Sequence, residues 1–244
     1  MLCRLTNGLR KIAAGLRPFS ESVWPGVRND LFVAHESIYD FFGNYVHGAR
    51  VLDAGCGTGY GARKLLDAGA QSVVGVDLDA FNIRYAKRHY SKPGLTFLRG
   101  NIERLDQPAQ SLDIVTASNS LEHLVHPEAF FAGLRRILVH HGKALIAVPP
   151  IITPEDAHAH SQIHYHRSNL TIHQWISLFH QSKFDVSCFS HRAAHPGIAP
   201  DFRSHKQSTL TSNDFIFVSA TPHDLYSEPS ISAVFILTLP ERLD

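Results

Sequence analysis

Short runs of β-branched and apolar residues alternate with longer amphipathic stretches from residue 50 onward. Period-two or continuous apolar runs predict strands, and apolar residues that recur every three or four positions predict helices. Strands are expected at residues 50–53, 72–76, 96–98, 113–117, 144–148 and 185–189. Helices are expected between them at residues 60–68, 80–89, 127–138 and 172–181.

This alternation is typical of a parallel sheet that helices cover on both faces. Two further candidate strands, at residues 215–219 and 232–238, follow a loop rich in proline, serine and histidine, and either could complete the sheet. The expected fold class is therefore α/β, a doubly wound and mostly parallel seven-stranded sheet. Thr171 and Gln174 form a capping box that predicts the start of the last helix.

The chain shows no internal repeat and no low-complexity linker, so one domain is expected at residues 33–244, after a lead-in helix and cap at residues 1–32. Basic residues and leucines at helical spacing fill the first 17 positions, without an acid. They predict an amphipathic helix packed on the domain, and the alternative is a membrane-surface or transit helix.

Composition narrows the function classes. The 244 residues are 44% hydrophobic and 18% charged, which excludes a disordered chain. The formal charge is only +1, so nucleic acid is not an expected partner. Three scattered cysteines argue against a disulfide framework and fit a reducing cytoplasm. No apolar run reaches the roughly 18 residues of a membrane span, so no stable membrane insertion is expected.

The strongest motif is a glycine-rich turn directly after the first expected strand. It carries Asp53, Gly55, Gly57 and Gly59, and glycines there let the chain bend sharply and let a ligand approach the backbone N–H groups. Asp77 ends the next strand, where a carboxylate can accept hydrogen bonds from both hydroxyls of a ribose. The two features together predict a nucleoside site.

Two cofactor classes use such a site. Gly57 to Ala62 satisfies the degenerate dinucleotide pattern, which would suit NAD(P). Asp53 favours the other class, because a carboxylate there would repel a pyrophosphate but would help to hold an ammonium group, directly or through water. S-adenosylmethionine carries that ammonium group and no phosphate.

On these motifs, residues 33–189 resemble the class I S-adenosylmethionine-dependent methyltransferases, in the small-molecule branch of type 11 and type 12 domains. The resemblance implies that the glycine turn wraps the methionine part and that Asp77 binds the ribose. Asn101 stands where the family usually has an aspartate that contacts the adenine amino group, and its carbonyl can accept the same hydrogen bond. The implied cofactor-binding residues are Asp53, Gly55, Gly57, Gly59, Asp77, Leu78, Asn101, Ile102 and Ser118.

Methyl transfer is an in-line displacement that depends mainly on positioning, but a hydroxyl acceptor must also lose a proton. Histidines are the candidates for this task, since 12 of the 17 lie between His123 and His195. His123 follows the fourth strand and is the first candidate for the base, with a packing role as its alternative. His164 and His166 are the second candidates, as base or substrate clamp.

No metal is expected. Quinone-pathway relatives hold a metal with acidic residues and a histidine in this region, whereas this chain has Asn119 in place of one acid. The run from His158 to His166 would put pairs of imidazoles on one face if it were extended, which could bind zinc or nickel. A polar surface loop is the plainer interpretation of that run.

The sequence thus predicts an enzyme that transfers a methyl group from S-adenosylmethionine to a small-molecule acceptor, with O-methylation ahead of N- or C-methylation. The alternatives are an NAD(P)-dependent oxidoreductase and a catalytically silent subunit that has kept the cofactor fold. Acceptor specificity is expected in residues 19–39 and in the loops after Val148 and Phe189. The Ser118-Asn119-Ser120-Leu121 segment lacks the proline pair that marks base-amine methylation.

Overall fold

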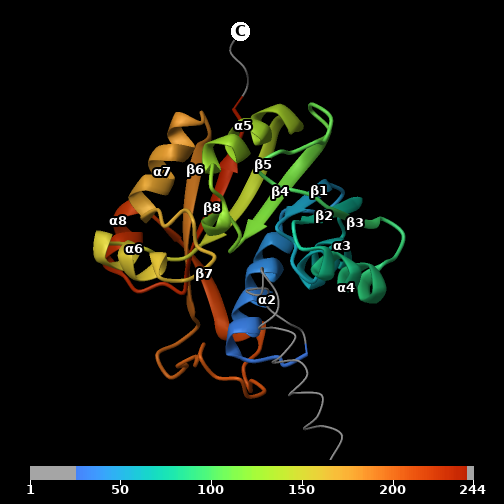
Figure 1. Cartoon of the computed structure of the whole chain (residues 1–244). Helices are drawn as coiled ribbons and strands as arrows, with labels where there is room; N and C mark the ends of the chain where they lie inside the picture. Colours follow the sequence, from blue (N-terminus) through green and yellow to red (C-terminus); the bar gives the residue numbers. More distant parts are fainter. Residues whose placement is uncertain (1–25, 241–244) are drawn as a thin grey trace, which may run out of the picture.

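Eight strands form one sheet in residues 26–240, the part of the chain that the computed structural model describes (Figure 1). Their order across the sheet is β3-β2-β1-β4-β5-β8-β6-β7. The strands are β1 (Arg50–Ala54), β2 (Ser72–Asp77), β3 (Leu95–Arg99), β4 (Leu112–Ser118), β5 (Leu138–Val148), β6 (Asp185–Ala193), β7 (Phe215–Ala220) and β8 (Ser232–Thr238).

The first five strands are parallel, and the last three complete the sheet with antiparallel pairs. β1 pairs with β2 and β4, β2 with β3, and β4 with β5, all in parallel. The carboxyl ends of these strands therefore meet at one edge of the sheet, where ligands bind in open α/β folds. The α/β class and the doubly wound arrangement expected from the sequence are confirmed.

The expected count of seven strands is wrong, because both late candidate segments join the sheet. β8 lies between β5 and β6 and is antiparallel to both, and β7 pairs with β6 at the edge. The two differ in burial as their positions require: six of the seven residues of β8 are buried, whereas Ile216 and Val218 of β7 are exposed. Both segments carry a continuous apolar run, at residues 215–218 and 233–237, so the hydrophobic pattern alone could not choose between them.

Seven helices and two short 3₁₀ turns connect the described strands. The four expected helices are present, each within about a residue of its expected ends. Three further helices were not expected: α2, α6 and α8. The helices are α2 (Asp30–Gly43), α3 (Tyr60–Asp67), α4 (Ala80–Tyr90), α5 (Pro127–Ile137), α6 (Pro154–Ser161), α7 (Ile172–Gln181) and α8 (Pro222–Ser227), with η1 (Leu121–His123) and η2 (Ser212–Asp214) as the 3₁₀ turns.

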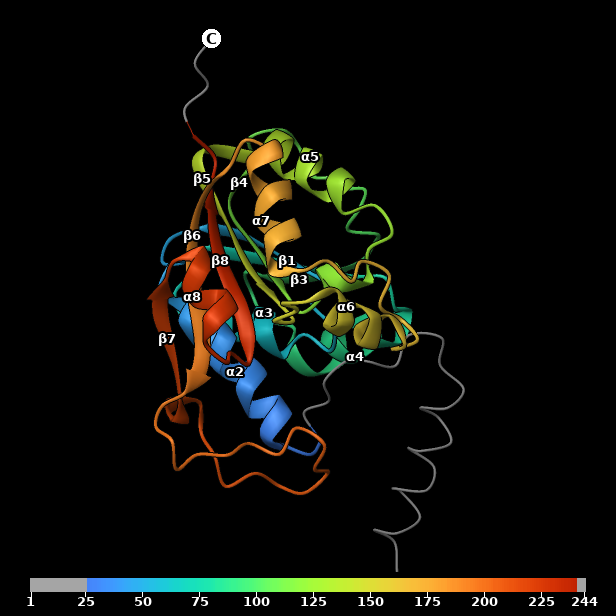
Figure 2. The same ribbon diagram turned by 90° about the vertical axis from the view of Figure 1, so that its left-hand side faces the viewer.

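The helices form one layer on each face of the sheet (Figure 2). α5, α7 and α8 bury apolar residues in one core, which includes Phe131, Trp175 and Leu225. α2, α3 and α4 bury theirs in a second core on the opposite face, which includes Phe42 and Leu65. α6 buries no residue and lies outside both cores.

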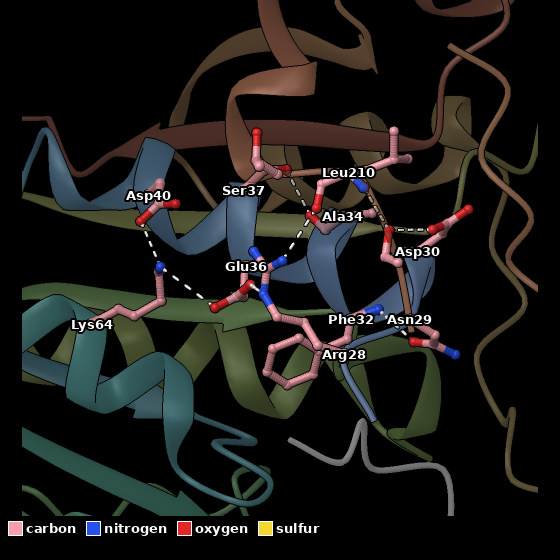
Figure 3. A network of polar contacts seen from close by, with 12 residues as sticks. Arg28, Asn29, Asp30, Phe32, Ala34, Glu36, Ser37, Asp40, Lys64 and Leu210 are labelled. Atoms are coloured by element: carbon pink, nitrogen blue, oxygen red, sulfur yellow. Dashed lines mark hydrogen bonds and ion pairs between the residues drawn. The ribbon is translucent and has the colours of Figure 1, made fainter. Parts of the chain in front are cut away.

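Ion pairs and loop contacts fix α2 on the molecule (Figure 3). Lys64 of α3 reaches Asp40 at 2.9 Å, and Arg28 pairs with Glu36 at 2.7 Å. The loop after β6 is tied to the start of the same helix, since Ser208 donates its backbone N–H to the Arg28 carbonyl at 2.8 Å. α2 is therefore anchored from two sides.

The expected division at residues 32 and 33 falls inside α2. The basic segment of the first 17 residues lies outside the described part of the chain, so its helix and its partner surface stay predictions. Within residues 26–240, every helix is too short or too polar to cross a bilayer.

Candidate active site

The turn between β1 and α3 requires glycine for two physical reasons. Gly55, Gly57 and Gly59 have φ values of 78°, 52° and 89°, in the left-handed region that favours glycine. A Cβ atom on Gly55 would lie 2.5 Å from the Cβ of Ser120, and one on Gly59 would lie 2.7 Å from that of Ala86. A side chain at Gly55 or Gly59 would therefore collide with neighbouring parts of the protein. α3 begins directly after the turn.

Asp77 holds this turn from the end of β2. Its Oδ2 accepts the backbone N–H of Gly57 at 2.9 Å, and its Oδ1 accepts that of Asp79 at 2.8 Å. Burial raises the pKa of Asp77, and the hydrogen bonds from the two backbone N–H groups oppose that rise. The carboxylate thus fixes the glycine turn and also lines the cavity described below.

Asp53 lies beneath the turn and is fully buried. Its Oδ1 accepts hydrogen bonds from the Thr116 hydroxyl at 2.8 Å and from the Tyr39 hydroxyl at 3.1 Å. Burial raises the pKa of Asp53 to about 7, the hydrogen bonds from Thr116 and Tyr39 lower it, and the charge of Asp77 raises it further. Asp53 is not among the residues that line the cavity, whereas Tyr39 is. The structure therefore places Asp53 to support the wall of the site.

A cavity of about 420 Å³ opens above the carboxyl ends of β1 to β4. This volume falls within the range of pockets that hold a cofactor or a small ligand, roughly 300–1,000 Å³. The structure brings eight of the residues expected from the sequence to its wall: Gly55, Gly57, Asp77, Leu78, Asn101, Ile102, Ser118 and His123.

Four other expected residues do not line this cavity. Gly59 caps the start of α3 and Asp53 lies behind Tyr39. His164 is exposed, with its ring 4.6 Å from that of Tyr165. His166 lies behind the wall, with its ring 5.1 Å from that of His123.

The run from His158 to His166 begins in a helix, so the extended chain that would align its imidazoles is not formed at its start. His158 and His160 lie in α6, which a capping box at Thr153 and Asp156 starts. Neighbours two positions apart point to different sides of a helix, so this pair does not share a face. The capping residues Thr153 and Asp156 are the signal in the sequence that marks the start of this helix.

Three potential metal ligands nevertheless come together beside the cavity. Glu122, His123 and His166 each offer an atom within 4.8 Å of those of the other two. Burial lowers the pKa of His166 to about 4, and the charges of His123 and His160 add to this effect. The cluster brings residues of η1 next to a residue of the segment after α6. No spacing in the sequence indicated that these two segments meet.

His123 has a defined orientation at the cavity wall. Its Nδ1 lies 3.2 Å from the backbone carbonyl oxygen of Tyr165. A carbonyl can only accept, so Nδ1 carries the proton of the neutral ring and Nε2 is its acceptor nitrogen.

The residues present fit a nucleoside. Ser118 and Asn119 line the cavity, and within residues 26–240 the hydroxyl of Ser118 and the amide nitrogen of Asn119 are buried without a hydrogen-bond partner. Buried polar atoms of this kind are normally satisfied, so they point to a polar ligand. Asp77 adds the carboxylate that ribose hydroxyls require.

Several lining residues were not expected from the sequence. His35, Tyr39 and Tyr60 come from the helices α2 and α3, and Tyr165 and Arg167 come from the segment after α6. The region of residues 19–39 was expected to govern specificity, but no motif singled out His35.

Comparisons with known proteins agree with this geometry. The family model described as "Methyltransferase domain" matches residues 52–146. A probable S-adenosylmethionine-dependent methyltransferase of Mycolicibacterium smegmatis is 30% identical over 168 residues, 68% of this chain and 64% of that protein. The ubiquinone biosynthesis O-methyltransferase of Methylocella silvestris is 39% identical over 87 residues, 35% of this chain and 34% of that protein.

Other similarities are more distant. A tRNA U34 carboxymethyltransferase of Pseudomonas fluorescens is 30% identical over 124 residues, 47% of this chain and 39% of that protein. The crystal structure of a possible histamine N-methyltransferase from Thermotoga maritima superposes with a TM-score of 0.64 at 14% identity, covering 86% of this chain and 91% of that one. That likeness shows the fold alone. The chain spans less than two thirds of the length of each of the three relatives above.

The sheet order, the glycine turn and the acid at the end of β2 define a nucleoside-binding α/β protein of the methyltransferase type. The resemblance of the chain to the class I S-adenosylmethionine-dependent methyltransferases, predicted from its sequence, is confirmed.

Proposed function

We propose that this protein transfers a methyl group from S-adenosylmethionine to a small-molecule acceptor, with an oxygen as the favoured acceptor atom. The observation that carries the proposal is the 420 Å³ cavity, because it combines the glycine turn, the Asp77 carboxylate and the unpartnered polar atoms of Ser118 and Asn119. The relative named as a ubiquinone biosynthesis O-methyltransferase supports the choice of oxygen.

Different residues of the cavity would contact different parts of the cofactor. Asp77 would accept hydrogen bonds from the ribose hydroxyls, and Leu78 and Ile102 would cover the adenine with apolar surface. Asn101 uses its Oδ1 to accept the backbone N–H of Glu103 at 2.9 Å. A carbonyl oxygen has two lone pairs, so the same atom can also accept from the adenine amino group.

S-adenosylmethionine, when bound, supplies an electrophilic methyl group. The contribution of the protein is to hold an acceptor in line with that group and to exclude water from the reacting atoms. His123 is the candidate that takes the acceptor's proton, since it lines the cavity and its Nε2 is the acceptor nitrogen. His164 and His166 do not line the cavity, which favours His123 over that pair.

Calorimetric titration with S-adenosylhomocysteine tests the cofactor assignment. Micromolar binding, about −8 kcal/mol, is expected. Heat with NAD and none with S-adenosylhomocysteine would instead favour an oxidoreductase. Binding without methyl transfer to a broad panel of acceptors would favour a silent subunit.

His123→Ala tests the proton step. We expect kcat to fall by roughly 10² to 10⁴ while the affinity for S-adenosylhomocysteine barely changes, since proton transfer matters only in the transition state. The double variant His164→Ala/His166→Ala is the matched control and should be mild. The reverse pattern would assign the base to the His164 and His166 pair.

The absence of a metal remains a prediction as well. The cluster of Glu122, His123 and His166 is the place where a bound metal would contradict it. We expect a chelator to leave activity unchanged. Activity that disappears with chelator and returns with added zinc or nickel would establish a metal site at this cluster.

A further inference from the structure

A second, smaller cavity adjoins the first, and its volume is about 190 Å³. Its wall includes Pro149 and Pro150 after β5, His160 of α6 and Phe202 of the loop after β6. It shares two residues with the first cavity, His35 of α2 and Asn119 after β4. These two residues therefore lie where the cofactor cavity and the smaller cavity meet.

The wall of the second cavity excludes charged ligands. It contains no aspartate, glutamate, lysine or arginine, and most of its residues are apolar. Burying an ion against such a wall is costly unless an opposite charge compensates it. The cavity is therefore suited to an uncharged molecule.

The volume sets the size of that molecule. A dry cavity of about 150 Å³ is sufficient to hold a benzene molecule. The 190 Å³ cavity thus has room for one ring with a small substituent, or for the ring end of a longer molecule.

Asn119 offers a hydrogen-bond donor at the junction. Its amide nitrogen is buried without a partner in the described part of the chain. Its φ value of 45° is uncommon for a residue other than glycine, and its backbone N–H donates to the Ala147 carbonyl at 2.8 Å. The backbone is therefore held in a conformation that places this side chain between the two cavities.

His35 offers an acceptor at the same place. Burial lowers its pKa to about 4, so the ring is neutral near pH 7 and keeps one nitrogen that can accept a hydrogen bond. Lys64 of α3 pairs with Glu36 and Asp40 (Figure 3), and these ion pairs anchor α2 in the turns that follow His35. The imidazole is thus carried by a rigid element.

We propose that the second cavity binds the methyl acceptor, an uncharged ring-sized molecule with a hydroxyl group, and that Asn119 and His35 hold this hydroxyl at the junction. The amide of Asn119 donates to the hydroxyl oxygen, and the hydroxyl donates to an imidazole nitrogen of His35. In this geometry His35 competes with His123 for the hydroxyl proton, and the kcat of His123→Ala distinguishes the two. This inference rests on the proposed methyltransferase function, and it names the chemical class of the acceptor.

Phenol titrated into the protein saturated with S-adenosylhomocysteine tests the proposal. The nucleoside fills the first cavity, so phenol binding then reports on the second. We expect phenol to bind in the millimolar range or tighter, and benzoate, which adds a charge to the same ring, to bind at least about tenfold more weakly.

Two substitutions locate the site. His35→Phe keeps a ring of similar shape without the acceptor nitrogen, and Asn119→Gly keeps the left-handed backbone without the amide. Each should weaken phenol binding to the S-adenosylhomocysteine-saturated protein at least about tenfold. The S-adenosylhomocysteine affinity of each variant is measured first, so that every phenol titration starts from a saturated first cavity. His158→Phe, an exposed histidine outside both cavities, is the control and should change neither affinity.

The outcomes separate the two proposals. Equal binding of phenol and benzoate, or unchanged phenol affinity in both variants, would overturn the acceptor site. Absence of phenol binding to the S-adenosylhomocysteine complex would overturn it as well. Failure of the wild-type protein to bind S-adenosylhomocysteine would overturn the proposed function instead, and phenol binding could still be measured in that protein.

Discussion

Asp53 and Asp77 are neighbouring acids with different surroundings and different tasks. Asp77 accepts two backbone N–H groups and faces the cavity, whereas Asp53 is fully buried and accepts two hydroxyl groups. The sequence pattern marks both as cofactor residues. Burial and hydrogen-bond partners separate the acid at the cavity wall from the acid that supports it.

Asp77→Ala should weaken S-adenosylhomocysteine binding by roughly 10- to 100-fold, because hydrogen bonds to a charged group contribute about 1.5–3 kcal/mol each. Calorimetric titration measures the change. Asp67→Ala is the control, since that acid is exposed and pairs with Arg63 and Lys92. Equal affinities of the two variants would remove Asp77 from the site.

Asp53→Ala should abolish the S-adenosylhomocysteine signal, in agreement with the sequence argument, but it should also destabilise the fold by about 2 kcal/mol. The physical reason is that the Thr116 and Tyr39 hydroxyls lose a buried partner. Asp53→Asn keeps an acceptor oxygen there and should retain most of both properties. Urea denaturation and calorimetry together measure them.

If Asp53→Asn is stable but has lost S-adenosylhomocysteine binding as fully as Asp53→Ala, the charge of Asp53 acts directly on the ligand.

At the scale of elements, the glycine turn owes its form to packing as well as to backbone conformation. Gly48 and Gly59 both have a positive φ, 69° and 89°. A Cβ on Gly48 would meet nothing within 4 Å, whereas one on Gly59 would meet Ala86 and Phe97 at 2.7 Å and 2.8 Å. The pair therefore separates the cost of the conformation from the cost of crowding.

Gly48→Ala should lower the free energy of unfolding by about 1 kcal/mol, the usual cost of a left-handed conformation. Gly59→Ala should lower it by at least about 1 kcal/mol more, because the turn must also move away from α4 and β3. Urea denaturation compares the two. Equal losses would show that the turn tolerates a side chain and that crowding plays no part.

At the scale of the whole molecule, histidines join elements that are distant in the sequence. His191 of β6 lies 3.0 Å from the Ser37 hydroxyl of α2 and stacks on Phe217 of β7, with ring centroids 4.6 Å apart. Burial lowers the pKa of His191 to about 3, and the charge of His35 contributes. The contact between α2 and the antiparallel half of the sheet therefore depends on a neutral imidazole.

Stability should fall as the pH drops below about 6.5, the ordinary pKa of histidine. Between that value and about 3 the unfolded chain binds a proton at His191 and the folded chain does not, so the free energy of unfolding decreases by up to about 1.4 kcal/mol per pH unit. Urea denaturation of the wild type and of His191→Phe at pH 7, 6 and 5 tests this. The wild type should lose more stability.

Asp53 changes the pH dependence of stability in the opposite direction, because its raised pKa favours the folded state at acidic pH. The wild type and His191→Phe both contain Asp53, so its contribution cancels when their free energies of unfolding are compared. Parallel pH profiles of the two proteins would contradict a neutral buried His191.

Local chemistry made several features predictable. The turn from Asp53 to Gly59 and the acid Asp77 follow from what a sharp bend and a ribose require, and the capping box at Thr171 and Gln174 marked the start of α7. These features depend on residues close in the chain, so the sequence determined the fold class, the cofactor class and eight of the residues that line the cavity.

Tertiary structure decided the rest, because it depends on contacts between distant segments. Whether β7 or β8 lies inside the sheet depends on which strand can be buried on both faces. The junction of His35 and Asn119 forms only when α2 is anchored to α3 and to the loop after β6. The sequence by itself therefore determined the cofactor class and part of the cavity wall, and only the folded chain decided that His35 and Asn119 line both cavities, since no local pattern records a meeting of α2 with the end of β4.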